Sequence, residues 1–106
     1  MTTLPPAVTI EPVWLVEATY GPDAAETRKP FRAEHLARAR MLKDTGVFVE
    51  VGAFADVSAS ILIVRAATAE AAIALVSDDV YLRNGVWVEV RARAFGRVAD
   101  RVVPTG

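Results

Sequence analysis

The sequence predicts a single α+β domain in which two helices pack on one face of a four-stranded antiparallel sheet. The chain has 106 residues, a length typical of one domain. Its 53% hydrophobic and 24% charged residues are the balance of a globular protein rather than a disordered one. Segments rich in β-branched and aromatic residues alternate with two segments of helical periodicity, in the order β-α-β-β-α-β.

The first half of this pattern contains one strand and one helix. Residues 1–12 include three prolines and no periodicity, so we expect an extended arm ahead of the fold. Residues 13–20 are rich in β-branched and aromatic side chains and should form the first strand. Pro30 suits the first turn of a helix, and Gly46 is expected to end that helix. The apolar face of the helix, spaced at three and four residues, consists of Phe31, His35, Leu36, Ala39 and Leu42.

The second half adds three strands and a second helix. Strands are expected over residues 47–54 and 60–66, and a last strand is expected over 86–95. Thr68 should cap the second helix. One face of this helix is expected to carry Ala72, Leu75, Val76 and Asp79. This order of elements predicts a ferredoxin-like βαββαβ sandwich. We expect the folded domain to cover residues 13–98 and a C-terminal tail to follow over 99–106.

The sheet face opposite the helices is predicted to be an interface. Aromatic side chains on it should lie in register with charged ones, a set that comprises Phe48, Phe54, Trp87, Glu50, Glu89, Arg91 and Arg93. An apolar face of this kind is usually covered by a partner chain. The sequence therefore predicts a homodimer.

Composition excludes several classes of site. Cysteine is absent and His35 is the single histidine, so one chain cannot build a thiolate or multi-histidine metal site, and we expect no metal or cofactor. The net charge of −1 argues against nucleic acid. Apolar runs are too short to cross a membrane, and the N-terminus lacks the pattern of a signal peptide, which makes the cytoplasm the expected compartment. The dispersed glycines form no phosphate-binding loop.

His35 is the first candidate for chemistry, because imidazole is the one side chain that ordinarily titrates near neutrality. Its position on the apolar helix face points it toward the sheet. Asp78 and Asp79 end the second helix, and a carboxylate that accepts the imidazole N–H would fix the tautomer that a general base requires. A histidine satisfied by the backbone is the structural alternative. Spacing does not choose between the two aspartates, since one residue turns a helical side chain by about 100°.

Three further residues could line a site around His35. Arg32 lies three residues ahead of it and could clamp a carboxylate or phenolate, or else belong to a solvated helix face. Gly52 interrupts a predicted strand, which indicates either a bulge or the close approach of a ligand. Tyr81 could offer a phenol near Asp79, or pack its ring at the edge of the core.

Several short segments in order resemble the YCII-related (YciI-like) family, a branch of the dimeric α+β barrel superfamily. The signature R-x-x-H-L corresponds to Arg32, His35 and Leu36. Later matches are Leu42, Gly46, Gly52, Glu70-Ala71-Ala72, Asp79-Val80-Tyr81, Gly85 and Arg93-Ala94-Phe95. The resemblance covers roughly residues 13–98. It implies a ferredoxin-like dimer with a His–Asp pair, here His35 and Asp79, in a pocket between sheet and helices.

The chemistry implied by this resemblance is a cofactor-free lyase or isomerase, since a dehydrochlorinase belongs to the wider family. In that hypothesis Asp79 orients His35, which takes a proton from a small anionic or phenolic substrate, while Arg32 and the backbone near Gly52 hold the oxyanion. A non-catalytic ligand-binding or regulatory dimer is the alternative, and a cofactor-independent oxygenase or lactone isomerase is a third. The family's prolines at positions 53, 80 and 94 are Ala, Val and Ala here, which is expected to alter the pocket.

Overall fold

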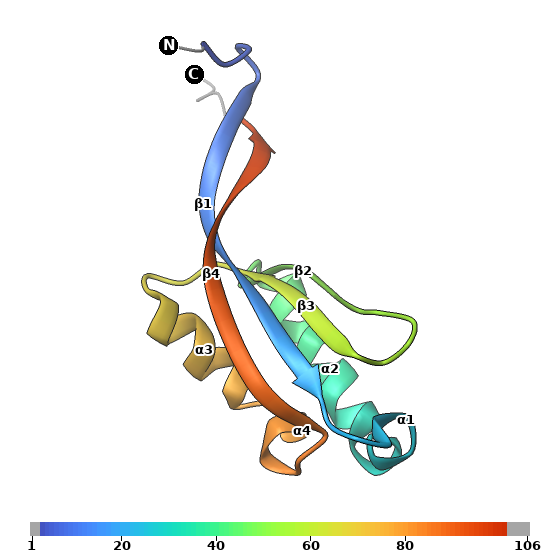
Figure 1. The fold of residues 1–106 in the computed structure, drawn as a ribbon. Helices are drawn as coiled ribbons and strands as arrows, with labels where there is room; N and C mark the ends of the chain where they lie inside the picture. Colours follow the sequence, from blue (N-terminus) through green and yellow to red (C-terminus); the bar gives the residue numbers. More distant parts are fainter. Residues whose placement is uncertain (1–2, 102–106) are drawn as a thin grey trace.

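The computed structural model describes residues 3–101 and has the predicted α+β architecture. Its four strands form one antiparallel sheet in the order β2-β3-β1-β4, and helices α2 and α3 lie on the same face of it (Figure 1). This is the ferredoxin-like arrangement that the sequence predicts. In chain order the elements are β1 (Val8–Tyr20), α1 (Ala24–Thr27), the 3₁₀ turn η1 (Lys29–Phe31), α2 (Arg32–Asp44), β2 (Phe48–Ala53), β3 (Ala59–Val64), α3 (Ala69–Ser77), α4 (Val80–Arg83) and β4 (Trp87–Asp100).

The paired strands β1 and β4 are longer than the sequence predicts. Residues 8–12 pair with residues 96–100 and form a two-stranded ribbon that projects beyond the rest of the sheet (Figure 1). The predicted arm over 1–12 is therefore wrong for residues 8–12, and the predicted tail is wrong for residues 99 and 100. Pro12 argued against a strand because proline lacks the N–H that strand pairing uses. In the ribbon, however, β1 has a single neighbouring strand, and proline is tolerated where its missing N–H faces no partner. Residues 1–2 and 102–106 of the predicted arm and tail lie outside the described residues.

Ion pairs of Glu11 with Arg65 and Arg97 stabilise the base of this ribbon. The Glu11 carboxylate accepts hydrogen bonds from Arg65 Nε at 2.6 Å and from Arg97 Nη1 at 2.7 Å. Arg65 also donates through Nη1 to the carbonyl of Gly46 at 2.6 Å. The hydrogen bonds from Arg65, then those from Arg97, lower the pKa of Glu11 from its ordinary 4.5 to about 2. Glu11 thus links the end of α2 to both strands of the ribbon.

Replacing Glu11 with glutamine is expected to lower the melting temperature at pH 7 and to leave it unchanged in strong acid. Because folding depresses the Glu11 pKa, its ion pairs stabilise the protein fully above pH 4.5 and are lost as the pH falls through about 2. Thermal melts of the wild type and Glu11→Gln at successive pH values test this. A difference in melting temperature that persists below pH 2 would contradict it.

Three helical elements, α1, η1 and α2, lie between β1 and β2, where a single helix was predicted. Pro30 lies in η1 and not in the first turn of α2, which begins at Arg32. Asp23, with φ of 61°, precedes the short helix α1. Gly46 has the positive φ expected of a residue that follows a helix end. Thr68 caps α3 as predicted, since its side chain accepts a hydrogen bond from Ala71 N at 3.0 Å.

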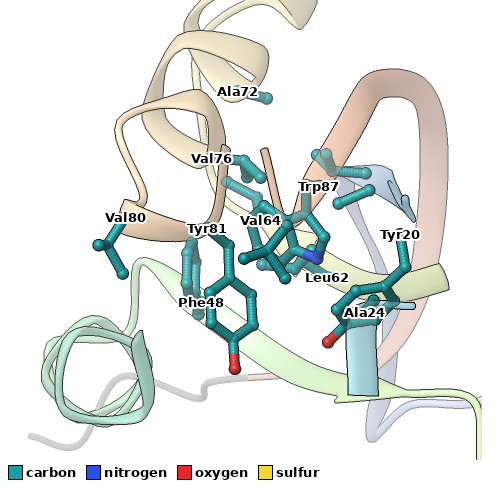
Figure 2. Packing of buried hydrophobic residues seen from close by; sticks show 13 residues of the cluster. Tyr20, Ala24, Phe48, Leu62, Val64, Ala72, Val76, Val80, Tyr81 and Trp87 are labelled. Carbon is teal, nitrogen blue, oxygen red and sulfur yellow. The ribbon is translucent and has the colours of Figure 1, made fainter. Parts of the chain in front are cut away.

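The prediction that Phe48 and Trp87 lie on the open face of the sheet is wrong. Both are almost completely buried beneath the helices, in the core that Figure 2 shows. Two bulges explain the error: two residues of β2 oppose one of β3 at Phe48–Glu50, and two residues of β4 oppose one of β1 at Trp87–Glu89. Each bulge reverses the alternation of side chains between the two faces. Phe54, the third predicted aromatic, lies just after β2 and is 52% exposed.

Candidate functional site

His35 and Asp79 form a buried pair between α2 and α4. Their side chains are 9% and 4% exposed, and His35 Nδ1 lies 2.9 Å from Asp79 Oδ2. Asp78, the alternative partner, is exposed at the end of α3. The geometry therefore selects Asp79 as the carboxylate that contacts the histidine.

Asp79 is held in place because it also begins a helix. Its backbone is extended, with ψ of 146°, and its Oδ2 accepts a hydrogen bond from Tyr81 N at 2.9 Å. Asp is a favoured cap for this purpose, since its side chain satisfies an N–H that the helix leaves free. Helix α4 was not predicted from the sequence, although an aspartate at position 79 is a typical N-cap residue. Val80 occupies the first position of this helix, where the proline of the related sequences would also fit.

Arg38 is a further partner of Asp79 that the sequence analysis missed. It lies one turn after His35 on α2, and its Nη1 is 3.5 Å from Asp79 Oδ1. Its Nη2 donates to the carbonyl of Leu75 at 2.7 Å, near the end of α3. The two carboxylate oxygens of Asp79 are thus directed to different partners. Spacing of three residues from His35 was the available signal, because such residues share a helix face.

The imidazole ring of His35 is fixed by aromatic packing as well. Tyr81 stacks on it with ring centroids 3.8 Å apart and planes 10° from parallel. Trp87 stands nearly perpendicular to both rings, at 5.2 Å from His35 and 5.4 Å from Tyr81. Since a carboxylate only accepts hydrogen bonds, a neutral His35 carries its proton on Nδ1 and leaves the lone pair of Nε2 free. This is the tautomer of a general base.

His35 and Tyr81 face a pocket of about 360 Å³ between α2, α4 and the end of the sheet. Of the predicted site residues, Arg32, His35, Gly52 and Tyr81 line this pocket, and Asp79 contacts His35 without lining it. Open space surrounds the position that a Gly52 side chain would take, so packing does not require glycine there. Three further polar residues line the pocket and were not predicted to belong to the site: Tyr20, Arg28 and Ser60.

Burial raises the pKa of Tyr81, and the neighbouring Tyr20 raises it further. The positive charges of Arg28 and Arg32 act in the opposite direction without cancelling the effect. The phenol of Tyr81 therefore stays protonated at neutral pH and can donate a hydrogen bond into the pocket. A neutral donor next to an imidazole base can stabilise the negative charge that develops on a substrate when the base removes its proton.

The described part of the chain contains neither a cluster of metal ligands nor a helix that could cross a membrane. Within residues 3–101, no three histidine, aspartate or glutamate side chains gather as metal ligands would. None of the described helices is long and apolar enough to cross a membrane. The His35 pocket is thus the place where the described residues combine a buried, hydrogen-bonded His–Asp pair with a cavity.

The fold and this pocket define a class of protein, a ferredoxin-like domain with a carboxylate-oriented histidine at the wall of a cavity. The model of the YCII-related domain family matches residues 13–96, most of the chain. The chain belongs to this family, as its sequence resemblance implies. Comparison with curated proteins finds no match to the chain.

Proposed function

We propose that this chain is a cytoplasmic, cofactor-free lyase or isomerase in which His35 abstracts a proton from a small anionic or phenolic substrate. The hydrogen bond of 2.9 Å between Asp79 and His35, at the wall of a cavity, is the observation that carries this proposal. A buried carboxylate in this position orients the imidazole and stabilises the cation that forms when it takes a proton.

The other residues of the pocket have roles in the same step. Nε2 of His35 accepts the proton from a carbon or hydroxyl of the substrate. Negative charge then develops on the substrate, and the guanidinium of Arg32 and the phenol of Tyr81 are available to stabilise it. Arg38 acts through Asp79 and does not line the pocket, so it is a positioning residue.

Hydrogen–deuterium exchange tests the proposal directly, because it follows the proton that His35 removes and does not require the product to be identified. Small carboxylic acids and phenols with acidic C–H bonds are incubated with the protein in D₂O, and loss of their proton signals is followed by NMR. We expect His35→Gln to slow enzymatic exchange by about 10²–10⁴-fold, the usual contribution of a general base. Arg40→Gln is the matched control, because Arg40 pairs with Asp44 on the solvent side of α2.

Exchange that survives His35→Gln unchanged would refute His35 as the base. Binding of panel members without any exchange would favour the alternative of a non-catalytic ligand-binding module. Circular dichroism of each variant, recorded alongside, separates loss of chemistry from loss of the fold.

We further propose that the protein acts as a homodimer through the sheet face opposite the helices. Leu15, Ile61 and Ile63 alternate with core residues and lie on this face, only partly buried within one chain. A partner would cover them. Sedimentation equilibrium should give a dimer for the wild type and for Met41→Glu, an exposed helix position, and a monomer for Ile63→Glu. A monomeric wild type, or a dimeric Ile63→Glu, would contradict this interface.

A further inference from the structure

We infer that Arg28 and Arg32 form a carboxylate-binding subsite in the His35 pocket, so that the substrate is a small carboxylic acid with an apolar body. This inference deepens the proposed function and shares its pocket. Arg28 lies outside the R-x-x-H-L signature, and its position in the site comes from the structure alone.

Both guanidinium groups are free of protein partners among the described residues. Within residues 3–101, neither Arg28 nor Arg32 lies within salt-bridge distance of a carboxylate, and neither side chain donates a hydrogen bond. Arg38 and Arg40, further along α2, both pair with aspartates. Arg28 is moreover partly buried and lines the pocket, where its planar guanidinium is available to an anion.

A short turn that contains Pro30 presents the two arginines together. Arg28 ends α1 and Arg32 begins α2, with Pro30 in the 3₁₀ turn between them. The N–H of Phe31 donates to the carbonyl of Arg28 at 2.9 Å and closes this turn. Both positive charges also act on the Tyr81 phenol across the pocket. A carboxylate held by these planar groups would therefore lie near the aromatic pair Tyr81 and His35.

The rest of the pocket lining suits an anion with an apolar body. None of the residues that line the pocket is acidic, so the two arginines give it a positive field. Leu36, Val51 and Phe54 supply apolar surface for the body of a ligand. The hydroxyls of Ser60 and Tyr20, 3.2 Å apart, offer polar contacts for a second group. A volume of about 360 Å³ is at the small end of ligand pockets, which restricts the acid to a compact one.

Matched probes test the subsite directly. The probes are 4-hydroxybenzoate and its uncharged counterpart 4-hydroxybenzamide, titrated to tens of millimolar against ¹⁵N-labelled protein while the amide spectrum is recorded. We expect the acid to bind at least about tenfold more tightly than the amide, since a charged hydrogen-bonded contact contributes more than a neutral one. The shifted signals should come from residues around Arg28, Arg32 and Tyr81.

Variants then assign the effect to the two arginines. Arg28→Gln and Arg32→Gln should each weaken binding of the acid by about tenfold or more and leave binding of the amide unchanged. Arg28→Lys should recover part of the affinity, because it keeps the charge and loses the planar fork. Arg40→Gln is the control on the same helix and should bind like the wild type.

Equal affinity for acid and amide, unchanged binding in Arg28→Gln, or no binding of the acid at tens of millimolar would each overturn the subsite. The outcome is separable from that of the proposed function. His35→Gln should still bind the acid, because His35 does not supply the positive charge. Arginine-dependent binding together with exchange that survives His35→Gln would leave the subsite standing and refute only the role of His35 as base.

Discussion

Replacing Asp79 with alanine is expected to lower the free energy of unfolding by about 3–5 kcal/mol, the range found when one member of a buried charged network is removed. The carboxylate accepts the N–H groups of His35 and Tyr81 and lies beside Arg38. Alanine leaves the two N–H groups without their acceptor and removes the carboxylate beside Arg38, at a position where the Asp79 side chain is only 4% exposed. It also removes the cap of α4, which contributes about 1 kcal/mol of the loss. Urea unfolding followed by tryptophan fluorescence measures the change.

Two neighbouring substitutions separate the causes. Asp79→Ser keeps an oxygen that can cap α4 but is too short to hold His35, so we expect it to recover about 1 kcal/mol relative to alanine. Asp78→Ala changes an exposed neighbour and should stay within about 0.5 kcal/mol of the wild type. Nitrogen-15 shifts of the single imidazole should show Nδ1–H in the wild type and lose this preference in both Asp79 variants. A loss below about 1 kcal/mol for Asp79→Ala would contradict a buried network.

The order of elements could be predicted because strands and helices leave different signals in the sequence. Residues 13–20 have the β-branched and aromatic composition of a strand, and the helix face around His35 repeats at three and four residues. The face of the sheet that each aromatic occupies could not be predicted in the same way. Alternation fixes that face only while pairing is regular, and the bulges before Glu50 and Glu89 turn Phe48 and Trp87 into the core.

The residues of the candidate site also differ in whether a local pattern predicts them. His35 and Arg32 were found because they share one helix, where spacing determines direction. Spacing alone narrowed the carboxylate only to Asp78 or Asp79, since its side chain is directed by the break between α3 and α4 and not by a helical period. The family resemblance is what pointed to Asp79. Arg28 and Tyr20 reach the pocket from other elements, and their approach depends on tertiary packing. Residues joined by long-range contacts leave no local pattern.

Tyr81 joins the core to the pocket, and replacing it with alanine is expected to cost about 3–5 kcal/mol of stability, as for other buried aromatic residues. Tyr81 is 1% exposed, and its ring lies against those of Tyr20 and Trp87 in the core (Figure 2). The same ring stacks on the imidazole of His35. Removing it takes away the stacked support of the imidazole together with the packing of Trp87. This loss is a large share of the roughly 5–15 kcal/mol that stabilises a domain. Urea unfolding of the variant provides the measurement.

Tyr81→Phe is the control that separates the ring from its hydroxyl. Phenylalanine keeps the shape of the side chain, so we expect a loss below about 1.5 kcal/mol and an unchanged Nδ1–H signal from His35. The same variant removes the neutral donor that faces the pocket and should slow exchange of a substrate whose negative charge that phenol stabilises. If Tyr81→Phe destabilises the protein as strongly as Tyr81→Ala, the hydroxyl has a structural role that its position at the pocket does not explain. If Tyr81→Ala costs less than about 1.5 kcal/mol, the stacked ring does not support the fold, and Asp79 alone holds His35 in place.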